Sequence, residues 1–323
     1  MSGVLRAELV RLRVRRFTWL VLVVVAAVSA SVAVYAWREA RTPTPAEVAA
    51  AHESYQQDRA AWLDGGRDDC EKRNRDMKAK GFEPFDCDLF APELENYVPY
   101  EPTWDDDGMP YLGSLASPVV IGALLLGASL VTAEFGAGSM GLWLTFVAPR
   151  GRAFRAKVAA AGVGGALVGL LGALVGAGGT LAAFAVLHRL HGNGWAASGV
   201  AGRLAVLGAL AAVVGAGLGF ALRHVAAVMG IALWWVLSVE VVAPLAWARA
   251  RPLTLGLNVR AWVEGSAPYT VPQWVADPQL TGGGSVQDVE HVVRGLQGGL
   301  VLAVVAAVVA VAGLVVFRVR DVS

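Results

Sequence analysis

Charged residues are scarce in this sequence, and lysine is the scarcest of them. Asp, Glu, Lys and Arg together make up 16% of the 323 residues, compared with about 25% in typical soluble domains. The only lysines are Lys72, Lys78, Lys80 and Lys157, and none of them follows a glycine. The chain therefore lacks a phosphate-binding P-loop, because that motif requires a glycine directly before its lysine.

Motifs for metal-dependent or nucleophilic catalysis are also missing. No HExxH sequence occurs, which argues against a zinc metalloprotease, and His188 and His191 alone are too few ligands for a typical zinc site. A rhomboid-like protease needs a Gly-x-Ser-Gly serine, whereas Ser139 in the run Gly136-Ala137-Gly138-Ser139 stands in the wrong place. We therefore predict that the chain is not an enzyme and has no catalytic, cofactor-binding or metal-binding residues.

Apolar residues, in contrast, make up 56% of the chain, and the mean hydropathy is +0.53. A helix needs roughly 20 mostly apolar residues to cross the hydrocarbon core of a bilayer, and in lipid such a segment must be helical to pair its own backbone amides. The sequence predicts an all-α membrane protein with six transmembrane helices, at 17–37, 114–133, 158–187, 203–222, 225–247 and 296–317. The first of these is too long for the apolar part of a cleaved signal peptide, which is about 7–15 residues.

Arginine and lysine near the ends of the spans predict the orientation, because cytoplasmic loops are rich in them. They gather in the segments 1–16, 134–157 and 318–323 and at Arg223, which six spans would place on one side. We therefore expect a multi-pass protein of a bacterial plasma membrane with both termini in the cytoplasm. Exceptions that would lie outside include Arg189, Arg203, Arg249, Arg251 and Arg260.

The segment 1–16 is predicted to be a cytoplasmic amphipathic helix. Leu5, Leu9 and Leu12 follow helical spacing, and the arginines fall off that face. Such a helix can lie at the membrane surface, with its arginines near anionic lipid headgroups.

Two longer segments are predicted to lie outside the lipid. The external region 38–113 contains the only cysteines, Cys70 and Cys87, which either form a disulfide in an oxidising compartment or remain free thiols. We expect helix over 46–80 and irregular structure over 81–110, where the acidic run Thr103–Asp107 is either a solvated turn or a cation site. In the second region, 248–295, short interfacial helices are expected.

Two features stand out inside the predicted spans. Span three contains small-xxx-small spacings, Gly165/Gly169 and Gly172/Gly176, which allow helices to approach closely in a compact bundle or in a dimer. Glu240 is an acid within span five. Intramembrane acids are candidates for function, but this one lies near the outer end of the span and could reach the interface.

The segment between spans two and three carries a resemblance to a known family. It contains Glu134, Gly136, Gly138, Ser139, Leu144, Thr145, Pro149 and Arg150, and Lys157 opens the next span. This pattern resembles the cytoplasmic loop of ABC-2 type transporter permeases, and Leu5-Arg6-Ala7-Glu8-Leu9 with Arg15-Arg16-Phe17 looks like the first helix of that family. The long external region 38–113 departs from many of its members.

The resemblance implies a function and partners. The chain would be the membrane subunit of an ATP-binding-cassette exporter, and the residues of 134–157 would couple it to a separate ATPase dimer that binds ATP and Mg²⁺. A second permease copy and the lipid membrane are the other implied partners, and no nucleic acid is expected. The alternative is a membrane anchor or sensor whose external region binds a partner.

Overall fold

The computed structural model describes residues 2–81, 83, 85–139, 141, 150–190, 196–276 and 284–320. Within them, six helices are long and apolar enough to cross a membrane: Arg16–Ala40, Trp104–Gly136, Arg150–Val186, Ser198–Leu222, Val225–Ala246 and Gly295–Val319. Each overlaps one of the six predicted spans, so the prediction of an all-α membrane fold with six spans is confirmed. The chain divides into two compact units, Arg38–Pro102 and the remainder.

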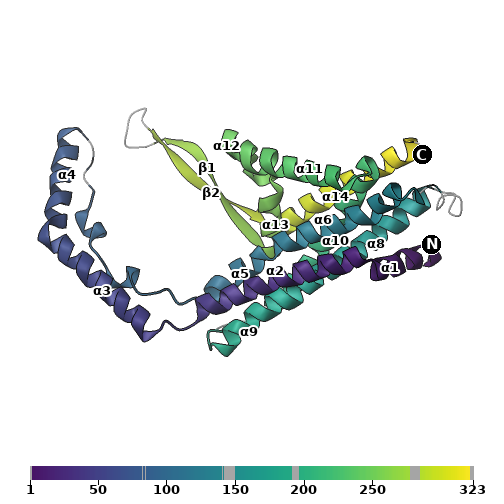
Figure 1. Ribbon diagram of the computed structural model, residues 1–323. Coiled ribbons are helices and arrows are strands. Elements are labelled where there is room, and N and C mark those ends of the chain that lie inside the picture. The colour runs from purple at the N-terminus through teal and green to yellow at the C-terminus, as the bar shows by residue number, and fades with distance from the viewer. Residues whose placement is uncertain are drawn as a thin grey trace. The chain divides into compact units, whose positions relative to one another are not determined.

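The larger unit contains the membrane spans and the elements that join them (Figure 1). Its elements are α1 (Ser2–Val14), α2 (Arg16–Ala40), α5 (Trp104–Ser114), α6 (Ala116–Gly136), α8 (Arg150–Gly172), α9 (Gly178–Val186), α10 (Ala196–Leu222), α11 (Val225–Trp235), α12 (Ala243–Ala246), α13 (Leu255–Glu264), β1 (Ser266–Ala276), β2 (Gly284–Arg294) and α14 (Gly295–Val319). A π-helical turn, Ala173–Ala177, joins α8 to α9, and another, Val236–Val242, joins α11 to α12.

Helix α10 is the centre of the bundle and packs against α6, α8 and α14. Glycines make this close approach possible. A Cβ on Gly165 of α8 would lie 2.2 Å from the carbonyl oxygen of Gly208 in α10, and one on Gly208 would lie 2.2 Å from that of Gly165. A Cβ on Gly169 would lie 2.1 Å from the carbonyl oxygen of Leu204. The small-residue pattern of span three therefore serves packing within the chain.

Substitution of one of these glycines tests the packing. We expect Gly165→Ala to lower the stability of the solubilised protein by about 1–3 kcal/mol, the usual effect of overpacking, because the methyl group has no space against α10. Gly178→Ala is the matched control, since a Cβ there has no neighbour within 4 Å. Thermal unfolding in detergent measures both variants. Equal midpoints would contradict the proposed contact.

The contacts of the bundle bring the basic segments together at one of its ends. Arg150 donates a hydrogen bond from Nη1 to the carbonyl oxygen of Arg318, 3.0 Å away, at the end of α14. The guanidinium of Arg223 lies over the ring of Phe135, 5.0 Å from its centroid. The amino end of α1 and the carboxyl end of α14 also lie at this end (Figure 1).

The unit Arg38–Pro102 is built from α3 (Pro45–Ala61), a π-helical turn (Trp62–Gly66), α4 (Arg67–Ala79) and two short 3₁₀ helices, Cys87–Phe90 and Leu94–Asn96. The expected helix over 46–80 is therefore present, but it is interrupted at Gly65, where φ is 146°. A disulfide joins Cys70 to Cys87, with 6.0 Å between the Cα atoms. Asn74 accepts from the backbone N–H of Phe85 and donates to its carbonyl oxygen.

A capping box starts the first helix of this unit. The hydroxyl of Thr44 accepts from the backbone N–H of Glu47, and the Glu47 carboxylate accepts from the backbone N–H of Thr44. The hydrogen bond from Thr44, together with Arg41, lowers the pKa of Glu47 to about 2. The sequence thus fixes the start of α3 locally.

Two of the predictions from the sequence were wrong. Irregular structure was expected over 81–110, but α5 begins at Trp104. The hydroxyl of Thr103 accepts from the backbone N–H of Asp106 and caps the helix, and the acidic residues of the first turn suit its dipole. The run Thr103–Asp107 is therefore a helix start and not a turn.

The second correction concerns the region 248–295, for which only short helices were expected. Helix α13 is present, but β1 and β2 form an antiparallel hairpin whose register runs from Ser266 opposite Arg294 to Ala276 opposite Gly284. Valine and threonine favour strands, and both strands of a two-stranded sheet are edges, where proline is tolerated. Pro268 and Pro272 do not prevent pairing for this reason.

Candidate functional site: a buried ion cluster

Three elements meet at the end of the bundle where the basic residues gather. Glu8 comes from α1, Glu134 from the last turns of α6 and Lys157 from the early part of α8. Leu12 of α1 is part of the hydrophobic core, and Leu5 packs against it. Because Glu8 shares this face of the helix, the same packing draws its carboxylate into the bundle.

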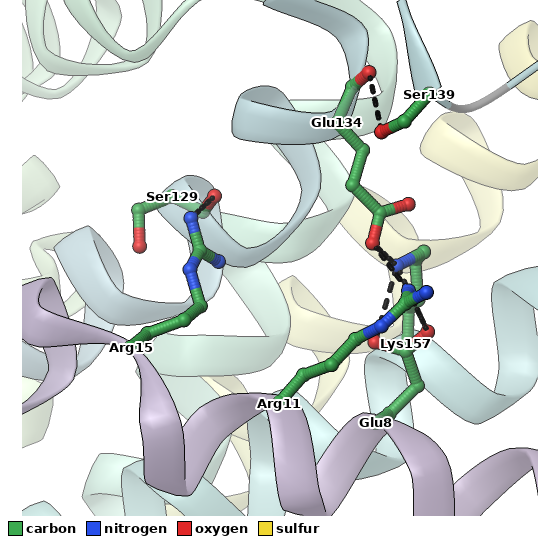
Figure 2. Close-up of polar contacts among 7 residues, drawn as sticks. All are labelled: Glu8, Arg11, Arg15, Ser129, Glu134, Ser139 and Lys157. Carbon is green, nitrogen blue, oxygen red and sulfur yellow. Dashed lines mark hydrogen bonds and ion pairs between the residues drawn. The ribbon is translucent and has the colours of Figure 1, made fainter. Parts of the chain in front are cut away.

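The charged side chains form one connected cluster (Figure 2). The Nζ of Lys157 lies 2.6 Å from Oε1 of Glu134 and 3.1 Å from each carboxylate oxygen of Glu8. Arg11 approaches from the surface, with Nη1 2.8 Å from Oε1 of Glu134 and 3.2 Å from Oε1 of Glu8. The side chains of Glu8 and Lys157 are 0% exposed, and that of Glu134 is 15% exposed.

The cluster contains two carboxylates and two cations, so its formal charge is zero. An isolated charge in an apolar interior has a large desolvation cost, which is offset only by close, hydrogen-bonded partners. Here each carboxylate has two cationic contacts. The arrangement links α1, α6 and α8 by charge-assisted hydrogen bonds, and removal of any one member leaves an uncompensated charge.

The sequence analysis identified Glu134 as a candidate coupling residue and Lys157 as the residue that opens the next span. It did not predict that Glu8, Arg11 and Lys157 lie together in one site. One signal was available: Glu8 lies on the leucine face of an otherwise amphipathic helix, where a charge is unexpected unless it has a partner. The identity of that partner, 149 residues away, is not encoded in any local pattern.

The other residues of the predicted coupling segment divide into three groups. Gly136 ends α6, Gly138 adopts a positive φ of 65°, and the Ser139 hydroxyl donates to the carbonyl oxygen of Glu134 over 3.4 Å. Arg150 contacts the end of α14. Three predicted residues lie outside the described part of the chain: Leu144, Thr145 and Pro149.

Glu240 lies away from this cluster, and its hydrogen-bond partners give it a structural role. Its carboxylate accepts hydrogen bonds from the backbone N–H groups of Leu255 (2.7 Å) and Gly256 (2.8 Å) and from Nε1 of Trp235 (3.0 Å). These backbone groups belong to the first turn of α13, where N–H groups lack helical partners. Glu240 therefore caps α13 and ties it to span five.

No group of three or more His, Cys, Asp or Glu side chains suited to a metal ion occurs among the described residues. In the acidic run Thr103–Asp107, Asp107 accepts a hydrogen bond from the backbone N–H of Thr103, and Asp106 accepts one from its hydroxyl.

Together, six long apolar helices and a bundle closed by glycine contacts define an α-helical, multi-pass membrane protein. A scan against protein-family models and a search of curated proteins both found no match for this chain.

Proposed function

We propose that the chain is the membrane-spanning permease subunit of an ATP-binding-cassette exporter of the ABC-2 type. A separate ATPase dimer, which binds ATP and Mg²⁺, would drive it, and a second permease copy would complete the transport path. The proposal places the protein in a bacterial plasma membrane with both termini in the cytoplasm, as the distribution of arginines favours.

The position of Glu134 is the observation that supports the proposal. It opens the stretch that resembles the family's coupling loop, and its carboxylate contacts Lys157 of α8 and Arg11 of α1. A partner that moved the segment between α6 and α8 would therefore move three helices together. The bundle needs no nucleotide site of its own for this, because the force would come from the partner.

Co-purification and ATPase activity test the proposal. We expect the tagged, gently solubilised chain to bring down a P-loop ATPase encoded beside it and to stimulate its ATP hydrolysis. We expect Glu134→Ala to abolish the stimulation while leaving membrane insertion intact, because the link between the segment and the helices is cut. Absence of any ATPase would refute the permease function.

Glu264→Ala is the matched control for Glu134→Ala. Glu264 has a similar side-chain exposure of 14% and also forms an ion pair, with Arg260 at 2.9 Å, but it lies on α13 and away from the cluster. We expect it to keep the stimulation. Equal loss in both variants, or unchanged stimulation in Glu134→Ala, would contradict the coupling function of Glu134.

The alternative, an anchor or sensor, is favoured by apolar side chains exposed on the unit Arg38–Pro102. Leu63, Leu89 and Phe90 are 71%, 81% and 60% exposed, and such residues can contact a partner. Replacement of residues 42–101 by a Gly-Ser linker distinguishes the two functions. A permease keeps its ATPase after this replacement, whereas a sensor loses its partner.

A further inference from the structure

A cavity of about 290 Å³ lies beside the ion cluster, between the α1–α2 joint and the last turns of α6. Its volume is near the lower limit of about 300–1,000 Å³ for small-ligand pockets. Its lining residues are Arg11, Val14, Arg15, Leu130, Ala133, Glu134 and Ser139.

The lining of this cavity is divided between cationic and apolar groups. Arg15 donates a hydrogen bond from Nη2 to the carbonyl oxygen of Ser129, 3.1 Å away (Figure 2). A guanidinium carries five N–H groups in a planar fork that suits phosphate, and Arg15 is half-buried, so water screens it less than a fully exposed arginine. Val14, Leu130 and Ala133 supply the apolar part.

The charge of the site limits what can bind. Glu134 also lines the cavity, but its Oε1 is already paired with Lys157 and Arg11. Arg15 therefore adds a positive charge beside a cluster whose formal charge is zero. This balance suits a ligand with a single negative charge better than one with two.

The cavity lies beside the ends of two apolar helices, where the edge of a bilayer is expected. Arg15 directly precedes α2, whose membrane-spanning segment begins at Arg16, and Leu130 and Ala133 belong to the last turns of the span α6. Trp19, one turn into α2, is 56% exposed and donates from Nε1 to the carbonyl oxygen of Arg13. Exposed tryptophan with a satisfied N–H is typical of the membrane–water interface.

From these observations we propose that the cavity binds the headgroup of a singly charged anionic membrane lipid. The lipid phosphodiester accepts hydrogen bonds from Arg15 and contacts Arg11, and its glycerol backbone packs against Val14 and Ala133. A soluble anion would leave the apolar part of the lining uncovered, which is why a lipid fits better. The site does not depend on the proposed transport function.

Lipid binding to the purified full-length protein tests this inference, with phosphatidylglycerol as the probe and native mass spectrometry as the measurement. We expect Arg15→Gln to weaken binding by about tenfold or more, because a charge-assisted hydrogen bond to phosphate is lost. Arg6→Gln is the control, since it removes the same charge from an exposed position of α1 outside the cavity. We expect its affinity to change by less than about twofold, as for a surface charge.

A second variant tests the cavity without any change of charge. Ala133→Phe fills the cavity, and we expect it to abolish the lipid binding that Arg6→Gln retains. If Arg15→Gln does not fold, this variant alone tests whether the cavity binds the lipid. Equal weakening by Arg15→Gln and Arg6→Gln would mean general attraction to anionic lipid and overturn the site. Competition by glycerophosphoglycerol, the deacylated headgroup with the same single charge, at the same concentration as the lipid would also overturn it, because a soluble phosphodiester would then suffice.

Discussion

Lys157→Met is expected to lower the stability of the solubilised protein by about 3–5 kcal/mol, the usual cost of breaking a buried ion pair from one side. Lys157 is fully buried and contacts both Glu8 and Glu134. Methionine has a similar length but no charge. In the cluster, the carboxylates of Glu8 and Glu134 would then share the single cation of Arg11. Thermal or urea unfolding of the full chain in detergent measures the loss.

Two further variants show whether charge imbalance causes this loss. Lys78→Met removes an exposed lysine of α4, and we expect a change within about 0.5 kcal/mol, as for most surface substitutions. The double variant Glu8→Leu with Lys157→Met removes one charge of each sign and should recover part of the stability of Lys157→Met, because apolar pairs can replace buried ion pairs. A double variant less stable than Lys157→Met would refute this explanation.

Removal of the disulfide is the second large expected effect. We expect the double variant Cys70→Ala with Cys87→Ala to lower the stability of the unit Arg38–Pro102 by about 3 kcal/mol, the loop-entropy value for a closed loop of this length. The two residues are separated by 17 positions. Pulse proteolysis in urea with an endoproteinase that cleaves only after lysine reports on this unit, because it contains three of the four lysines, Lys72, Lys78 and Lys80.

The redox state supplies the controls for this experiment. Reductant should lower the stability of the unmodified protein to that of the double variant. It should leave the stability of the double variant unchanged. A maleimide should label Cys70 and Cys87 of the unfolded protein only after reduction. Labelling without reductant would contradict the disulfide.

The spans were predictable because the signal for them is local. Each of the six stretches is long and apolar enough to cross a bilayer whatever its neighbours do, and the helices that the structure contains overlap all six. The close glycine contacts of span three also followed from local spacing, since Gly165 and Gly169 fall on one face. The sequence left open whether this face would contact another helix of the same chain or a second copy. In the structure it contacts α10 of the same chain.

The two failures have different causes, a local helix cap in one region and the pairing of distant residues in the other. The prolines and acidic residues of 81–110 suggested irregular structure, but the cap at Thr103 starts a helix that continues towards α6. Short interfacial helices were expected over 248–295, but β1 pairs with β2, and both strands are edges, where proline is tolerated.

Glu240 shows the same limit in another form. Its position within a span marked it as unusual, but its partners are the first backbone N–H groups of α13. Those groups lie on a different element, so only the fold could explain why an acid is stable there.

By itself, the sequence determined that this protein crosses a membrane with six helices, because length and apolarity act within each segment. The tertiary structure alone decided which charges meet. Glu8 and Lys157 are 149 residues apart and Arg11 and Glu134 are 123 apart, and their pairing depends on how α1, α6 and α8 pack. Electrostatic attraction at about 3 Å depends on where the charged ends of the side chains lie in space. The hydropathy of a segment does not contain that information.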